Sequence, residues 1–105
     1  MAVTYTSTGP EFAYDSARWK DVDWYVEYYM RADSGTFYAR LYDVTAAAAV
    51  TGSDASTTST TPVRIRVGPV TLTNGNSYRV QRGVDTTLGD AGELINARLV
   101  ALRKP

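Results

Sequence analysis

Two consecutive runs of alternating residues, 24–32 and 36–44, constrain the fold of this 105-residue chain more than any other feature. Successive side chains of a β-strand point to opposite faces, so each run separates into an apolar set and a polar set. Residues 33–35, Asp-Ser-Gly, lie between the runs and are typical of a turn. The pattern predicts two β-strands joined by a tight connection.

The length of that connection predicts how the two strands would pair as a β-hairpin. Residues that pair across a hairpin share a face, so loop length and alternation must agree. A three-residue loop would pair Met30 with Tyr38 and mix the apolar and polar sets. A two-residue loop at residues 34–35, or a four-residue loop of the same parity, pairs Met30 with Ala39 and keeps the sets apart. On the opposite face, this register pairs Arg31 with Tyr38, Tyr29 with Arg40, and Glu27 with Tyr42.

The aromatic residues of the two strands therefore fall into two sets. The predicted core face consists of Trp24, Val26, Tyr28, Met30, Phe37, Ala39 and Leu41. The second face, a candidate interface or ligand face, consists of Tyr25, Glu27, Tyr29, Arg31, Tyr38, Arg40 and Tyr42. Arginine can stack on tyrosine, and such pairs across strands stabilise a sheet, which is one interpretation of this face. Tyrosine and arginine are also enriched at protein interfaces, and we favour a contact surface for subunits or proteins over one for sugars.

Further short segments predict additional strands. Residues 2–6 alternate weakly and fit an edge strand, while residues 63–67 alternate strictly, with Arg64 and Arg66 on one face. Gly68-Pro69 predicts the end of that strand. Residues 70–73 and 78–82 flank the turn Asn74-Gly75-Asn76 and predict a β-hairpin. Residues 94–102 form a long apolar strand that suits a central position in a sheet.

Other segments carry weaker signals. Residues 51–62 contain eight serine or threonine residues and predict a solvated connection, although an exposed strand or a receptor-facing loop fits as well. Residues 83–93 resemble a loop, and residues 11–23 fit a strand, a helical turn or a loop. No segment has helical periodicity. Seven to nine short strands predict a single all-β domain over residues 1–105, an antiparallel β-sandwich of the jelly-roll or immunoglobulin-like kind.

Composition argues against an enzyme. The chain has no histidine and no cysteine, which removes the commonest general base, thiol nucleophiles, disulfides and zinc–thiolate sites. Opposite parity separates Glu27 from Asp43, so they do not form a catalytic carboxylate pair, and Glu27 is better explained as an arginine partner. No phosphate-binding, dinucleotide-binding or serine-hydrolase motif is present. We predict no catalytic residue and no cofactor.

Metal binding has two weak candidates. Asp21 and Asp23 form one group, and Asp85, Asp90 and Glu93 form another; carboxylate oxygens are calcium ligands. Neither group has the spacing of a calcium-binding loop, so turn and capping roles are favoured. We predict no metal site.

Charge and hydropathy exclude two kinds of partner. Eleven basic and eleven acidic residues give zero net charge, which disfavours nucleic-acid binding because that requires a positive field. The longest apolar run, residues 46–50, is too short to cross a membrane. Residues 1–10 lack the basic and apolar regions of a signal peptide.

Four segments together have the strand pattern of a known group of modules: SGTFYARLYDVT, GSDASTTSTTPVRIRVGPVTL, GNSYRVQ and NARLVAL. Over about residues 22–102, the chain resembles small jelly-roll modules of tailed-phage virion proteins and modules beside carbohydrate-active domains of bacterial proteins. The resemblance implies a jelly roll with a structural or adhesive role, often as a trimer, and sometimes glycan binding. It carries over no site residue.

We therefore expect a non-enzymatic structural protein, a capsid decoration protein or tail component that forms a homo-oligomer, preferably a trimer, through the Tyr/Arg face. Its partners would be capsid or tail proteins, and its location the virion or the host cytoplasm during assembly. The alternative is an extracellular carbohydrate-binding module whose exposed rings stack on sugar. The candidate rings are Trp19, Tyr25, Tyr29, Tyr38 and Tyr42.

Overall fold

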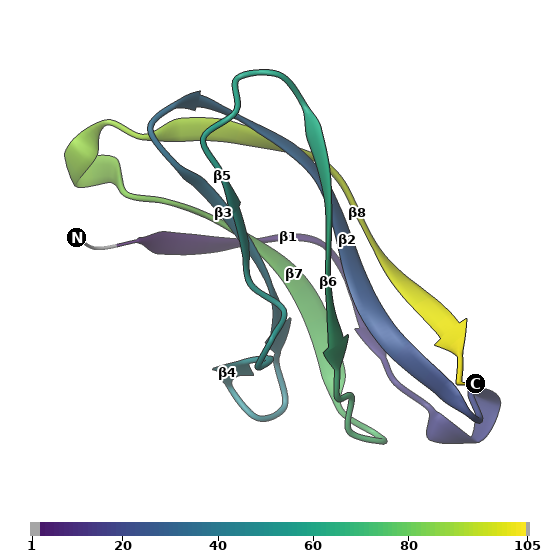
Figure 1. Ribbon diagram of the computed structural model, residues 1–105. Helices are drawn as coiled ribbons and strands as arrows, with labels where there is room; N and C mark the ends of the chain where they lie inside the picture. Colours follow the sequence, from purple (N-terminus) through teal and green to yellow (C-terminus); the bar gives the residue numbers. More distant parts are fainter. Residues whose placement is uncertain (1–2, 105) are drawn as a thin grey trace.

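Two antiparallel β-sheets pack face to face in the computed structural model, which describes residues 3–104 (Figure 1). The five-stranded sheet contains β1 (Thr4–Ala13), β7 (Ser77–Val84), β3 (Phe37–Asp43) and β4 (Ala48–Ala49) in that order, and β5 (Ala55–Thr57) also pairs with β3. The three-stranded sheet has the order β6 (Val63–Val70), β2 (Val22–Ser34), β8 (Ala91–Arg103). Short 3₁₀ helices, η1 (Ser16–Arg18) and η2 (Thr86–Leu88), complete the chain. The predicted all-β sandwich is confirmed, and its jelly-roll form stays a prediction.

The predicted hairpin between the first two alternating runs is wrong. β2 pairs with β6 and β8, whereas β3 pairs with β7, β4 and β5, so the two strands belong to different sheets. Gly35, with φ of 65°, and Thr36 carry the chain from one sheet to the other. The pairing of Met30 with Ala39 and the other pairs of that register therefore do not form.

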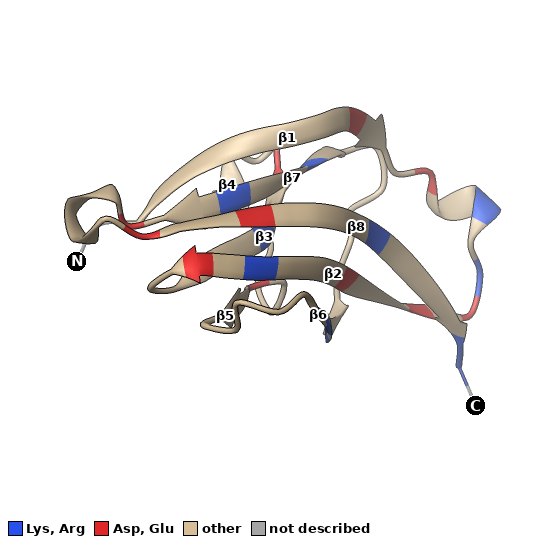
Figure 2. Cartoon of the chain, turned by 90° about the horizontal axis from the view of Figure 1, so that it is seen from above, with Lys and Arg blue, Asp and Glu red and all other residues tan. Residues whose placement is uncertain are grey.

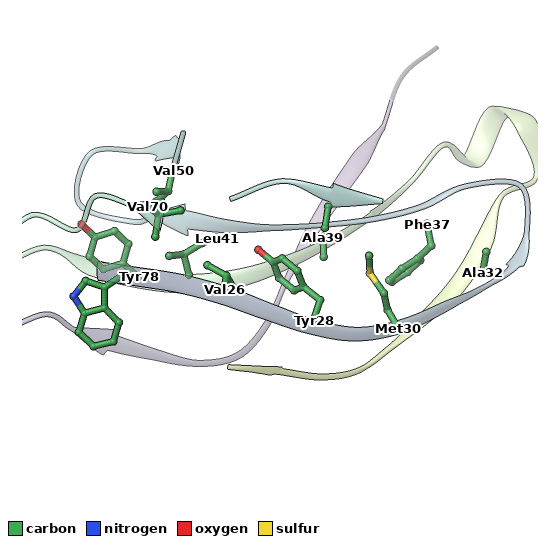
Figure 3. Close-up of a cluster of buried hydrophobic side chains, with 12 residues drawn as sticks. Val26, Tyr28, Met30, Ala32, Phe37, Ala39, Leu41, Val50, Val70 and Tyr78 are labelled. Atoms are coloured by element: carbon green, nitrogen blue, oxygen red, sulfur yellow. The ribbon is translucent and has the colours of Figure 1, made fainter. Parts of the chain in front are cut away.

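The predicted core face is confirmed, because a crossing between sheets also turns the apolar faces of both strands inward. Figure 3 shows Val26, Tyr28 and Met30 of β2 pointing toward β3, whose inward residues meet them across the interior. All seven predicted residues are buried: Trp24, Val26, Tyr28, Met30, Phe37, Ala39 and Leu41. Further contributions to this core come from Ala32, Val50, Ala55, Val70 and Tyr78.

The serine- and threonine-rich segment is not wholly solvated, because Ser53 lies inside the core. The Ser53 hydroxyl accepts a hydrogen bond from the Leu41 N–H at 3.0 Å and lies 2.7 Å from the Val50 carbonyl oxygen, to which it donates. The buried Tyr28 hydroxyl donates to the Ser53 carbonyl at 2.6 Å. Burial raises the pKa of the Tyr28 hydroxyl, which keeps its donor proton in place.

A second predicted hairpin, around the turn Asn74-Gly75-Asn76, is also wrong. β6 lies in the three-stranded sheet and β7 in the five-stranded sheet, so this turn also connects the two sheets. β6 continues through Gly68-Pro69, where the peptide bond is cis and the register with β2 shifts between Trp24 and Val26. The expected end of the strand at Gly68-Pro69 is therefore replaced by an irregularity inside it.

The predictions for the first and last strands differ in accuracy. β1 is an edge strand, as predicted for residues 2–6, but it extends to Ala13; residue 2 lies outside the described residues. β8 was expected at the centre of a sheet, and this is wrong, because β2 occupies the centre and β8 pairs with β2 alone. β8 is also longer than residues 94–102, since it begins at Ala91.

Candidate functional site

The seven residues of the predicted Tyr/Arg face lie on two surfaces instead of one. Tyr25, Glu27, Tyr29 and Arg31 are on the outer face of the three-stranded sheet, since their neighbours in β2 point into the core. Tyr38, Arg40 and Tyr42 are on the outer face of the five-stranded sheet for the same reason. The single predicted face is wrong in its geometry because β2 and β3 are in opposite sheets.

Glu27 is the centre of a charged cluster on the three-stranded sheet. Register places it opposite Arg66 of β6 and Arg98 of β8, and Arg64 lies two residues along β6. Its Oε1 accepts from Arg64 Nη1 at 2.9 Å and from Arg98 Nε at 2.9 Å, and its Oε2 accepts from Arg66 Nη2 at 3.1 Å. We call this surface the arginine face; it comprises Glu27, Arg64, Arg66 and Arg98 with Tyr25 and Tyr29 beside them.

The arginine face carries more positive than negative charge. Hydrogen bonds from Arg64, and then from Arg66 and Arg98, lower the pKa of Glu27 to about 2 against the effect of its desolvation. One ionised carboxylate neutralises one of the three guanidinium groups. The Glu27 side chain is only 5% exposed, whereas the three arginine side chains are 44–57% exposed. The remaining positive charge is therefore accessible to a partner.

Neighbouring groups define the limits of the arginine face. Arg31 forms ion pairs with Asp33 and, at 3.5 Å, with Glu93 of β8, so it adds no free positive charge. Figure 2 shows these alternating basic and acidic segments of β2 and β8 lying side by side. The Arg64 guanidinium carbon lies 5.0 Å from the centre of the Tyr29 ring, a cation–π distance.

The outer face of the five-stranded sheet is built around Arg40. Its guanidinium carbon lies 3.7 Å from the centre of the Tyr5 ring and 5.6 Å from that of Tyr42. Its Nε donates to Gln81 Oε1 at 2.7 Å. The expected stacking of arginine on tyrosine is present here, with Tyr42 as an expected member and Tyr5 as one that sequence reasoning missed. Arg40 is occupied by neighbours in its own sheet, which fits sheet stabilisation.

The sequence also did not predict the role of Arg98. It did not predict that Arg64 and Arg66 would bind Glu27. Strict alternation placed Arg64 and Arg66 together on a polar face, and this is confirmed by their register opposite Tyr29 and Glu27. The expected arginine partner of Glu27 is also confirmed. The available signal was one acidic residue in an alternating strand and arginines in two others, but it did not specify which strands pair.

A groove runs along the side of the sandwich where β1 and β8 form the two sheet edges. One part, of about 530 Å³, is lined by both strands, including Phe12, Ile95 and Leu99. An adjoining part, of about 450 Å³, shares Phe12 and Leu99 and is lined also by Trp19 and Trp24. The two indole rings meet edge to face with their centres 5.1 Å apart, and Trp19 is 46% exposed.

Several of the acidic residues considered for catalysis or metal binding have local structural roles. Glu27 and Asp43 lie on different sheets, and Asp43 accepts from the Ala46 N–H and from Asn76. Burial raises the pKa of Asp43, but these hydrogen bonds outweigh it and lower the pKa overall. Asp85 caps η2 through Thr87. Within residues 3–104, no group of three or more carboxylate side chains is arranged to hold a metal ion.

No protein-family model matches this chain, and no curated protein or solved structure matches it at a significant level. In the part of the chain that the structure describes, no helix is long and apolar enough to cross a membrane.

Proposed function

We propose that this chain is a non-enzymatic structural protein that binds an acidic surface of another protein through the arginine face. The observation that carries this proposal is the charge imbalance around Glu27, where one buried carboxylate pairs with three half-exposed arginines. Arginine favours such contacts because its planar group donates two parallel hydrogen bonds to a carboxylate. The resemblance to virion modules supplies the setting, with a capsid or tail protein as the partner.

The charge of the arginine face also restricts how it can be used. Two copies of this face cannot pack directly on each other, because that would bring like charges together and cost binding energy. The partner surface must therefore supply carboxylates. In a trimer, which the resemblance implies, the arginine face of each copy would have to meet a different, acidic surface of the next copy.

The test uses any capsid or tail proteins whose genes lie beside the gene for this chain. We expect at least one of them to bind the purified full chain, with an affinity that falls as salt rises, because exposed charges are screened. The double variant R64Q/R66Q should bind roughly tenfold or more weakly, as expected when central arginines of an interface are lost. R18Q/R82Q is the matched control, since it also removes two exposed arginines, one in η1 and one in β7 of the other sheet.

Two results would count against this function. One is equal binding by wild type and R64Q/R66Q, which would place the contact elsewhere. The other is a gene neighbourhood without capsid or tail proteins, together with no binding to any neighbouring gene product.

Carbohydrate binding is the second candidate, and one observation favours it. Trp19 is 46% exposed beside a groove that Tyr14 and Trp24 also line, whereas Tyr25, Tyr29, Tyr38 and Tyr42 are half-buried. Sugar rings stack on exposed aromatic side chains, so Trp19 is the best placed of the predicted rings. A glycan array probed with wild type and W19A tests this role. Binding of a neutral oligosaccharide that W19A loses would support it, and no bound glycan would remove it.

A further inference from the structure

β8 presents a long strand edge that no other described strand covers. It spans Ala91–Arg103 and pairs with β2 along one edge, while its other edge faces the side groove. Such an edge exposes backbone N–H and C=O groups that are able to pair with another strand. Native proteins usually block long edges with proline, glycine irregularities, lysine or a covering segment.

The other sheet edges of the described chain are short or contain glycine and proline, which leaves them with shorter regular stretches than β8. β1 contains Gly9-Pro10, and its register with β7 shifts there. β6 contains the cis peptide Gly68-Pro69, while β4 and β5 have only two and three residues. In β8, by contrast, residues 96–103 include no glycine, proline or lysine, and their register with β2 is unbroken; the register shift at Ile95 lies just before this stretch. Among the described strands, β8 therefore has a long regular edge that is available for pairing.

The surface beside this edge is apolar. Ile95 and Leu102 of β8 are 43% and 41% exposed, which makes them two of the most exposed large hydrophobic residues in the described chain. The inward side chains of β8 are only partly buried although they face the core: Leu94, Ala97, Leu99 and Ala101. Ile95 and these inward side chains line the groove, so covering the groove would remove their apolar area from water, and burial of such area drives association.

We propose that β8 pairs in antiparallel fashion with β8 of a second copy, forming a two-fold dimer with one continuous six-stranded sheet. The occupant is a second copy because the strand is self-complementary. Ile95 is the extra residue at the register shift between Asn96 and Leu94, so residues 96–102 form the regular part of the strand. Paired residues must share a face, so each inward residue opposes an inward residue of the second copy. The two-fold axis therefore passes through one residue of this regular part and not between two residues.

Centring the pairing on Leu99 gives compatible neighbours on both faces. Leu99 meets the partner's Leu99 and Ala97 meets the partner's Ala101 on the inner face, over the two grooves. On the outer face, Arg98 meets the partner's Val100 and Asn96 meets the partner's Leu102. No like charges are opposed, whereas centring on Arg98 would place two arginines directly opposite each other, which is destabilising. The zero net charge of the chain adds no general repulsion between copies.

The dimer does not rest on the proposed function, but it is compatible with it. Pairing along the edge leaves the arginine face on the outer surface, so two such faces would lie on one extended sheet. A binding partner with repeated acidic sites, such as a regular shell or tube, would then be bound by two sites at once, which raises the effective affinity.

The test measures the mass of the full chain by light scattering during size-exclusion chromatography, with two opposite substitutions at Val100. V100K places a lysine opposite Arg98 of the partner subunit at two symmetric positions, and we expect the mass to fall from twice the 11.5 kDa chain mass to that of the monomer. V100E places a carboxylate opposite the same arginine and should remain a dimer. Both variants lose the same valine, so lost apolar contact cannot explain opposite results.

L88K is the control for loss of an exposed hydrophobic residue elsewhere, since Leu88 lies in η2 and is 67% exposed; it should stay dimeric. Circular dichroism confirms folding of each variant. A wild type that stays monomeric at 100 μM or above, on the order of the weakest specific contacts, would overturn the proposal. An oligomer that V100K leaves intact would overturn it as well and would direct attention to another surface. Loss of partner binding in R64Q/R66Q with an intact dimer would separate this inference from the proposed function, because both substitutions lie in β6, away from the β8 edge.

Discussion

Glu27 makes the stability of the three-stranded sheet depend on pH. Its pKa is lowered from the ordinary 4.5 to about 2, first by the hydrogen bond from Arg64 and then by those from Arg66 and Arg98. A carboxylate with a depressed folded-state pKa stabilises the folded protein fully above its unfolded pKa of 4.5. That contribution is lost progressively as pH falls from about 4.5 toward 2, where the group becomes protonated in both states.

We therefore predict that E27Q flattens the acid side of the stability profile. At neutral pH the variant should be less stable than wild type, because three arginines then lack their common carboxylate. As pH falls from about 4.5 toward 2, the difference between the two proteins should shrink, since Glu27 of the unfolded wild type becomes protonated first and Glu27 of the folded wild type follows as pH approaches 2. Urea unfolding midpoints measured between pH 7 and about pH 2 check this. A constant difference over that range would show that charge at Glu27 is not the cause.

The Ser53 hydroxyl forms hydrogen bonds with several backbone groups in the core. Its Oγ accepts from the Leu41 N–H and donates to the Val50 carbonyl, and all of these atoms are shielded from water. We predict that S53A lowers the free energy of unfolding by about 1–3 kcal/mol, the usual cost of leaving buried polar groups unpaired. S56A is the control: Ser56 is exposed in β5 and its loss should change stability by less than about 0.5 kcal/mol. Equal effects of S53A and S56A in denaturant unfolding would contradict the prediction.

Alternation alone separates the inward from the outward side chains of β2 and β3. The core residues were predicted correctly because parity depends only on the local extended backbone. Ser53 was not found because it is one of eight similar residues in a twelve-residue segment, and nothing local distinguishes a buried hydroxyl from an exposed one. Arg98 was missed for a related reason, since its importance arises from a carboxylate 71 residues away.

At the element scale, the tight connection between β2 and β3 depends on Gly35. Its φ is 65°, and a Cβ at this position would lie 1.9 Å from Asp90 Oδ1. Asp90 also accepts a hydrogen bond from the Thr36 N–H, and Ser34 Oγ donates to the Gly89 carbonyl. The crossing between sheets is thus held against the turn that precedes β8, so the two connections support each other.

We predict that G35A destabilises the protein more than G89A. Both glycines have positive φ, so each alanine has a backbone cost of about 1–2 kcal/mol. Only at Gly35 does the new methyl group also displace the Asp90 carboxylate, because a Cβ at Gly89 would meet nothing within 4 Å. Thermal unfolding of the two variants measures the difference. Equal midpoints would show that the contact with Asp90 does not restrict this turn.

The sequence predicted most strands but not their partners. A short polar connection between two alternating runs is compatible with a hairpin in one sheet and with a crossing between two sheets. Both choices turn the same side chains inward, so the hydrophobic pattern does not distinguish them. Residues 33–35 and 74–76 were both interpreted as hairpin turns, and both connect the two sheets. The choice depends on long-range pairing, here of β2 with β8 and β6, which no local segment encodes.

The same limit applies to β8. A nearly continuous apolar strand is typical of a position buried on both faces and between two neighbours. β8 has this composition but lies at an edge, with its apolar side chains partly exposed along the groove. The mismatch between composition and position is resolved if a second copy supplies the missing neighbour.

At the scale of the whole molecule, the candidate site was predictable only in part. Tyrosines and arginines were correctly expected on outer surfaces, but the sequence indicated one shared face where the sandwich has two. Because the residues of the predicted face are divided between opposite sheets, Arg40 is stacked on tyrosines within its own sheet, and the free positive charge is concentrated around Glu27. The two surfaces available for assembly, the arginine face and the β8 edge, then differ in chemistry, one charged and the other apolar.

That difference leads to a prediction about stability at the level of the assembled protein. If β8 edges pair, folding and dimerisation are coupled, and the midpoint of thermal unfolding must rise with protein concentration by mass action. For a dimer of this size, we expect about 3 °C for each tenfold increase in concentration. The rise should be similar at low and high salt, because contact along an apolar strand edge is not weakened by screening.

Calorimetry of wild type and V100K from micromolar to near-millimolar concentration tests this. V100K should unfold at the same temperature at every concentration, because the unfolding of a monomer does not depend on protein concentration. R64Q/R66Q should keep the concentration dependence of wild type, since both substitutions lie in β6, on the arginine face and on the far side of β2 from the pairing edge. A concentration dependence that high salt abolishes, or that R64Q/R66Q removes while V100K retains it, would assign self-association to the arginine face.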